Sequence, residues 1–96
     1  MDVAWTIPAL DDLDEIQDYI AQDSPITAHR FIVDLMDRTN AVLGAQPMAG
    51  RPGRLPETRE WIVPRAAYIV AYRVNKCIEV LAVINAAKQW PDDLTH

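Results

Sequence analysis

The chain has 96 residues, of which 50% are apolar and 24% are charged, and its net charge is -5. This length leaves room for one core, so we expect one domain over residues 1–96, with 91–96 as a flexible tail. The composition excludes disordered and fibrous classes. The lone Cys77 excludes an intrachain disulfide or a cysteine-based metal cluster and favours a reducing compartment. No apolar run reaches a membrane span and no basic region precedes one, so we expect a cytoplasmic protein.

The charge is divided between the two halves of the chain. Residues 1–50 hold nine acidic residues and two arginines, whereas residues 51–88 hold seven basic and three acidic residues. An acidic partner would therefore meet the second half.

The N-terminal third predicts a strand and a helix. Residues 3–6 form a short β-type run, and Pro8 fixes a φ suited to a first helical turn, so a helix begins near it. Apolar residues then recur at spacings of three and four, with acids on the other side, which is typical of an amphipathic surface helix. These apolar residues are Leu10, Leu13, Ile16 and Ile20.

A second helix follows after a short break. Ser24 is a typical N-cap and Pro25 a typical first helical residue. The apolar stripe that follows runs to about Leu43 and is ended by Gly44 and Pro47. Because the link is short, the two helices should be antiparallel neighbours.

The second half predicts a loop and three strands. Residues 48–57 contain four glycine or proline residues, a density that favours a loop over a helix or strand. Three β-type runs follow at 59–63, 67–74 and 77–84, and the two-residue link Asn75–Lys76 suits a hairpin in which asparagine takes a positive φ. The expected fold is α+β: an N-terminal strand, an antiparallel helical hairpin and a three-stranded antiparallel meander (β-α-α-β-β-β).

Four segments carry a resemblance to a known family. They are W-T-I-P-A-L-D-D-L-D-E-I-Q-D-Y-I (5–20), P-M-A-G-R-P-G-R-L-P-E-T-R-E (47–60), A-Y-I-V-A-Y-R-V (67–74) and W-P (90–91). In this order and spacing the chain resembles the ParE-like branch of the RelE/ParE toxins of type II toxin-antitoxin systems, also called plasmid stabilisation proteins. The resemblance covers nearly the whole chain.

The resemblance implies a toxin that binds and traps DNA gyrase without chemistry of its own, and it implies no cofactor and no metal. The residues expected to contact the target are three arginines, two tryptophans and a proline, and arginine and tryptophan are enriched among interface hot spots. They are Arg51, Arg54, Arg59, Trp61, Trp90 and Pro91. The alternative interpretation is that an arginine beside Glu57 or Glu60 forms a solvated surface ion pair.

Other relatives cleave messenger RNA on the ribosome, which requires a proton acceptor and groups that stabilise phosphate charge. The candidates for such a nuclease are Arg59, Arg65, Tyr68, Arg73 and Lys88. The last strand departs from the family, since Asn85 stands where a histidine is common and a neutral amide can only hydrogen-bond. Cleavage is therefore the second hypothesis, and a degenerate member that binds an antitoxin without being toxic is the third.

The resemblance also implies a ParD-like antitoxin that folds onto the toxin. Ile32, Met36 and Trp61 are candidates for the apolar surface that would receive it. The alternative is that Ile32 and Met36 widen the core-facing stripe of the second helix. Tyr68 and Tyr72, four residues apart on one strand, pack against a helix under the structural interpretation and stack on a base under the functional one.

Overall fold

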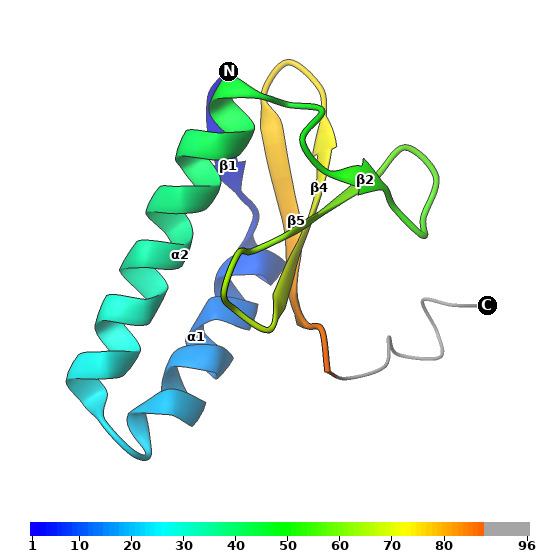
Figure 1. Cartoon of the computed structure of the whole chain (residues 1–96). Coiled ribbons are helices and arrows are strands. Elements are labelled where there is room, and N and C mark those ends of the chain that lie inside the picture. The colour runs from blue at the N-terminus through cyan, green and yellow to red at the C-terminus, as the bar shows by residue number, and fades with distance from the viewer. Residues whose placement is uncertain (88–96) are drawn as a thin grey trace.

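Two helices lie side by side on one face of a β-sheet in the computed structural model, which describes residues 1–87 (Figure 1). Helix α1 spans Ile7–Ala21, and its N-cap Thr6 accepts a hydrogen bond from the amide of Ala9. Pro8 occupies its first turn, where the missing N–H is not needed. The helix therefore begins one residue before the proline from which it was predicted.

Helix α2 spans Pro25–Ala45, and the Ser24 hydroxyl accepts from the amide of Thr27 at 3.3 Å. The predicted cap and first helical residue are confirmed. The link between the helices is three residues long, so α1 and α2 pack as antiparallel neighbours. Neither helix is long and apolar enough to cross a membrane, a finding that covers residues 1–87.

The sheet has five strands in the order β1-β5-β4-β3-β2. The N-terminal strand β1 runs parallel to β5, whereas the β5–β4, β4–β3 and β3–β2 pairs are antiparallel. The predicted α+β fold and the meander are thus confirmed, with β4 and β5 central. The strands are β1 Val3–Trp5, β2 Arg51–Pro52, β3 Arg59–Ile62, β4 Tyr68–Val74 and β5 Ile78–Asn85.

Two local predictions were wrong. The segment 48–57, predicted as a loop throughout, contains β2, which is possible because it lies at the sheet edge, where the missing N–H of Pro52 is tolerated. The hairpin after β4 has three connecting residues, because Val74 pairs with Ile78. Asn75 does not take a positive φ. In the described part of the chain, the non-glycine residues with a positive φ are Glu57 and Arg65.

The core fills the space between the helices and one face of the sheet. Alternate residues of β4, Val70 and Tyr72, belong to it together with Trp61 of β3. Their neighbours Glu60 and Ala71 pair across β3 and β4 and therefore share the opposite face, which we call the helix-free face. The helices contribute Ala9, Leu13, Ile32, Leu35 and Leu43 to the same core.

Candidate functional site

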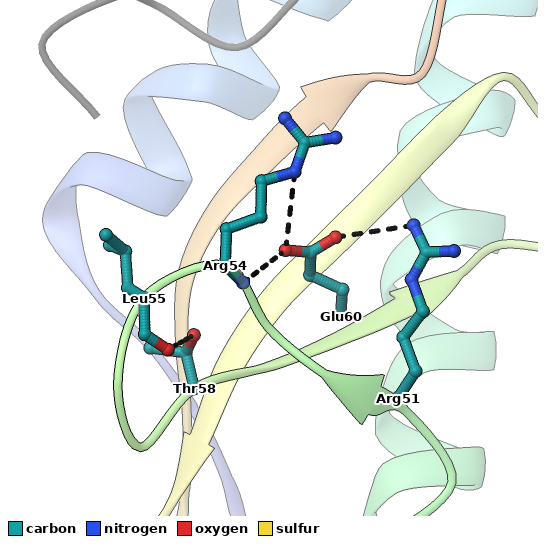
Figure 2. A network of polar contacts seen from close by, with 5 residues as sticks. All are labelled: Arg51, Arg54, Leu55, Thr58 and Glu60. Atoms are coloured by element: carbon teal, nitrogen blue, oxygen red, sulfur yellow. Dashed lines mark hydrogen bonds and ion pairs between the residues drawn. The ribbon is translucent and has the colours of Figure 1, made fainter. Parts of the chain in front are cut away.

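The β2–β3 hairpin, residues 51–60, carries a buried carboxylate between two arginines (Figure 2). Arg51 pairs with Glu60 across the hairpin, which places both on the helix-free face. Glu60 Oε1 lies 3.5 Å from Arg51 Nη2, and Oε2 accepts from the Arg54 main-chain N–H at 3.0 Å and lies 3.9 Å from Arg54 Nε. The Glu60 side chain is 2% exposed, against 56% for Arg51 and 45% for Arg54. The carboxylate is therefore enclosed while both guanidinium groups reach the surface.

The tip of the hairpin is closed by its own hydrogen bonds. The Gly53 amide donates to the Thr58 carbonyl at 2.7 Å, and the Thr58 hydroxyl donates to the Leu55 carbonyl at 2.7 Å. Glu57 adopts a φ of 63°, a left-handed conformation that turns the chain back into β3. These bonds fix the main chain of Arg54, so its N–H points at Glu60.

The segment that leads into the hairpin is fastened to the core by Tyr72. This fully buried side chain donates its hydroxyl proton to the Pro47 carbonyl at 2.8 Å and accepts from the Gly50 amide at 2.9 Å. Arg59 donates from Nη1 to the Gly50 carbonyl. A Cβ added at Gly50 would lie 2.7 Å from the Tyr72 hydroxyl oxygen, so the close approach requires glycine. The hairpin is therefore held at its base as well as at its tip.

A second ion pair lies on the helix-free face. Arg73 Nε and Nη2 donate to the two oxygens of Glu79, at 3.0 and 3.2 Å, and Asn75 Nδ2 donates to Glu79 Oε1 at 2.9 Å. The hydrogen bond from Arg73, followed by that from Asn75, lowers the pKa of Glu79 below its ordinary value. The same pair raises the pKa of Arg73. Both groups are charged at neutral pH and neutralise each other.

The opposite end of the sheet holds the turn between β3 and β4. Arg65 lies exposed in this turn with a φ of 61°. Tyr68 pairs with Asn85 across β4 and β5, and its ring packs against Phe31 with 5.6 Å between the ring centroids. Burial, with a smaller contribution from Tyr19, raises the pKa of Tyr68, so its hydroxyl keeps its proton at neutral pH.

Comparisons with known proteins identify the family. The model of the family described as "ParE toxin of type II toxin-antitoxin system, parDE" matches residues 3–90. The chain belongs to the ParE toxin family. A Sinorhizobium fredii protein named "Putative toxin Y4kP" is 40% identical over 92 residues, which cover 96% of this chain and 95% of that protein. "Toxin RelE2" of Caulobacter vibrioides is 32% identical over 87 residues, covering 90% and 96% of the two chains.

A solved structure supports the same assignment. The chain matches a structure described as "Chromosomal ParDE TA system from P. aeruginosa" with a TM-score of 0.78 and 30% identity, over 88% of this chain and 95% of that chain. The predicted family and fold are thereby confirmed, and the chain is a type II toxin of the ParE/RelE kind. The match to a toxin-antitoxin pair supports an antitoxin as its partner.

The ParE-family fold brings together part of the predicted target-binding set. Arg51 and Arg54 converge on Glu60, whereas Arg59 projects from the other face of the hairpin and is half-buried. Trp61 is 9% exposed and lies in the core. The remaining members of the predicted sets, Lys88, Trp90 and Pro91, lie outside the described residues, as does the predicted tail 91–96.

The residues predicted to receive an antitoxin are buried or partly buried in the isolated chain. Ile32 is 8% exposed and belongs to the core, and Met36 packs against it. The alternative interpretation, in which these residues widen the core-facing stripe of α2, describes where they lie. Their role in antitoxin binding stays a prediction.

The structure adds residues that sequence reasoning did not single out. Glu60 was considered only as a surface partner of an arginine. Trp61 and Val63 face the core, and because side chains alternate along a strand, their spacing was the signal that Glu60 faces the other side of the sheet. Asp12 of α1 was not singled out either: its carboxylate accepts from the amide of Val83, 71 residues away, at 2.9 Å. Within residues 1–87, no group of three or more His, Cys, Asp or Glu side chains could hold a metal ion.

Proposed function

We propose that this chain is the toxin of a ParE–ParD-type pair and that it inhibits DNA gyrase by binding, without catalysing a reaction. The observation that carries the proposal is the β2–β3 hairpin, in which Arg51 and Arg54 reach the surface while their shared partner Glu60 stays buried. Arginine is enriched among interface hot spots, and side chains that are ordered before binding lose less entropy when they bind.

The positions of the nuclease candidates favour binding over cleavage. Arg59 lies on the helix side of the sheet, Arg73 is paired with Glu79 on the helix-free face, and Arg65 is in the turn at the far end. Cleavage requires a base and charge-stabilising groups around one phosphate. Tyr68 keeps its proton, which makes it a poor base at neutral pH. The described candidates therefore do not converge on one reacting atom.

A ribosome-dependent messenger RNA endonuclease is the alternative function. The name of the Caulobacter relative, "Toxin RelE2", favours it. Under this alternative, Arg65 would neutralise phosphate and Tyr68 would donate a proton, because both lie at the end of the sheet where Asn85 ends β5. A non-toxic chain that only binds an antitoxin is a third possibility, and it predicts normal growth when the chain is expressed alone.

Purified gyrase separates these functions. We expect the chain to inhibit supercoiling or to stabilise cleaved DNA, and we expect Arg51→Ala with Arg54→Ala to weaken this effect by at least tenfold. Arg30→Ala is the matched control, because it removes an exposed arginine from α2 on the other side of the molecule. Unchanged gyrase activity at saturating toxin would contradict the proposal, and cut messages in a translation extract would favour the alternative.

The antitoxin partner is tested by co-expression. We expect the product of an adjoining short reading frame to co-purify with the chain and to restore both growth and gyrase activity. Restored growth without formation of a complex would contradict neutralisation by direct binding.

A further inference from the structure

The two edges of the sheet differ in how they are protected. The strand order leaves β1 and β2 as the outer strands. An exposed edge strand can pair with a further strand, and proteins commonly prevent this with proline or charged side chains. The β2 edge has both, in Arg51 and in Pro52, which has no N–H to offer. The β1 edge consists of Val3, Ala4 and Trp5, which are uncharged and can all donate.

The hydrogen-bond pattern of β1 shows which of its main-chain groups stay unpaired. The Ile78 amide of β5 donates to the Asp2 carbonyl at 2.8 Å. Because ladder bonds involve alternate residues of a strand, Ala4 also bonds toward β5, whereas the N–H and C=O groups of Val3 and Trp5 point outward. Within residues 1–87, no strand and no side chain pairs with these outward groups.

We propose that β1 pairs antiparallel with β1 of a second copy of this chain, about a two-fold axis at Ala4. In this register Val3 of each copy lies opposite Trp5 of the other, and each such pair exchanges two main-chain hydrogen bonds. The contact uses the same residues in both copies, so it closes at a dimer. The two five-stranded sheets then form one continuous sheet.

The side chains of β1 suit this register. Val3 and Trp5 are partly buried against the core, so both point to the helical layer. Across the axis, the tryptophan of one copy would lie beside the valine of the other, and aromatic residues paired with β-branched ones stabilise a sheet. Ala4 is exposed on the helix-free face, where its small side chain meets its own copy without a clash. The neighbouring Asp2 lies opposite Thr6, so like charges do not meet.

The dimer would leave the proposed target-binding hairpin free. Strands β2 and β3 lie at the other end of the strand order from β1. The two hairpins would therefore lie at opposite ends of the joined sheet. A target with two sites would bind such a dimer more tightly than one hairpin, because the second contact is intramolecular. This consequence rests on the proposed function, whereas the pairing of β1 does not.

Sedimentation of the full chain tests the pairing, at concentrations from about 1 μM to about 1 mM, where weak complexes dissociate. We expect the weight-average mass to rise from 10.8 kDa toward twice that value. Because each copy carries a net charge of -5, added salt should strengthen the dimer by screening the repulsion between copies. The mass of a single chain at every concentration would overturn the inference and leave the edge to a different partner. A dimer that salt weakens would overturn it too.

Two substitutions of Val3 separate the main-chain bond from side-chain packing. Val3→Pro removes the outward N–H and leaves the bonds to β5, and an edge strand tolerates proline where the N–H faces solvent. We expect it to weaken dimerisation by about tenfold or more, since both symmetry-related pairs lose a hydrogen bond. Val3→Ala is the matched control, because it also loses the packing of valine but keeps the N–H. Equal weakening by the two substitutions would contradict the proposed pairing.

Disulfide crosslinking tests the register independently, in a chain that carries Cys77→Ser. Ala4 and its copy form a non-hydrogen-bonded pair with Cα atoms about 4.5 Å apart, a separation that a disulfide spans. Ala4→Cys should therefore oxidise to a covalent dimer. Asp2→Cys is the matched control, because its two copies would lie at least about 13 Å apart. Absence of the Ala4→Cys dimer, or equal crosslinking at both positions, would overturn the inference. Gyrase and antitoxin take no part in these measurements, so a failure of the proposed function leaves their result standing.

Discussion

Replacing Tyr72 by phenylalanine should destabilise the fold through two hydrogen bonds while keeping its packing. The hydroxyl bridges the Pro47 carbonyl at 2.8 Å and the Gly50 amide at 2.9 Å, in a position that the core covers completely. Loss of a buried hydrogen bond costs about 1 kcal/mol, and each group left unpaired in the interior adds to that cost. We therefore expect the free energy of unfolding to fall by about 2 kcal/mol, or the midpoint by about 10 °C for a domain of this size.

Urea unfolding followed by circular dichroism measures this loss. Tyr68→Phe is the matched control, because the Tyr68 hydroxyl makes no hydrogen bond to the described residues while its ring packs against Phe31. We expect this variant to remain within about 0.5 kcal/mol of the parent. In Tyr72→Phe the Gly50 amide should also exchange faster with solvent. Equal stability of the two variants would refute the view that Tyr72 fastens the hairpin to the core.

Three further results are expected. Arg73→Gln should raise the pKa of Glu79 toward its ordinary value in a carboxyl NMR titration. Because the pKa of Glu79 is lower in the folded state, the stability that this carboxylate contributes is lost as the pH falls below about 4.5. The free energies of unfolding of parent and variant should therefore converge at such a pH. Asp12→Ala should lower the free energy of unfolding by about 1 kcal/mol in urea, because the Val83 amide of β5 loses its acceptor, and an unchanged value would contradict this role. Gly50→Ala should cost about 2 kcal/mol in thermal unfolding, since its Cβ would meet the Tyr72 hydroxyl at 2.7 Å, and a neutral result would mean that the turn relaxes.

The helical hairpin could be predicted because its signals are local. Ser24 caps α2 through the amide of Thr27, and Pro25 begins the helix, so two adjacent residues specify where it starts. The stripe of Leu35 and Leu43 repeats at helical spacing and is buried as expected. The signals for β4 and β5 were also local, because each strand is a run of apolar residues that is too long for a loop.

The parts that were missed depend on partners that are distant in sequence. The two residues of β2 have no strand pattern of their own, and only pairing with β3 makes them a strand. The parallel pairing of β1 with β5 brings residues 3–5 beside residues 78–80, and no local residue spacing predicts such a distant pairing. The same holds for Glu60 and Tyr72, whose roles depend on a loop folding back over them. For the site, the arginines could be predicted by residue type, whereas the acid that organises them could not.

The division of charge along the chain becomes a division between two faces of the molecule. The exposed acids of α1, such as Asp14 and Asp18, lie in the helical layer, whereas Arg51 and Arg54 lie on the helix-free face of the sheet. A protein with charges separated in this way is oriented by the field of its partner before contact, which raises the rate of productive encounters. An acidic partner surface should therefore meet the hairpin first. Because that steering weakens as salt screens the charges, the association rate should fall with ionic strength, whereas contacts made after docking should depend on it much less.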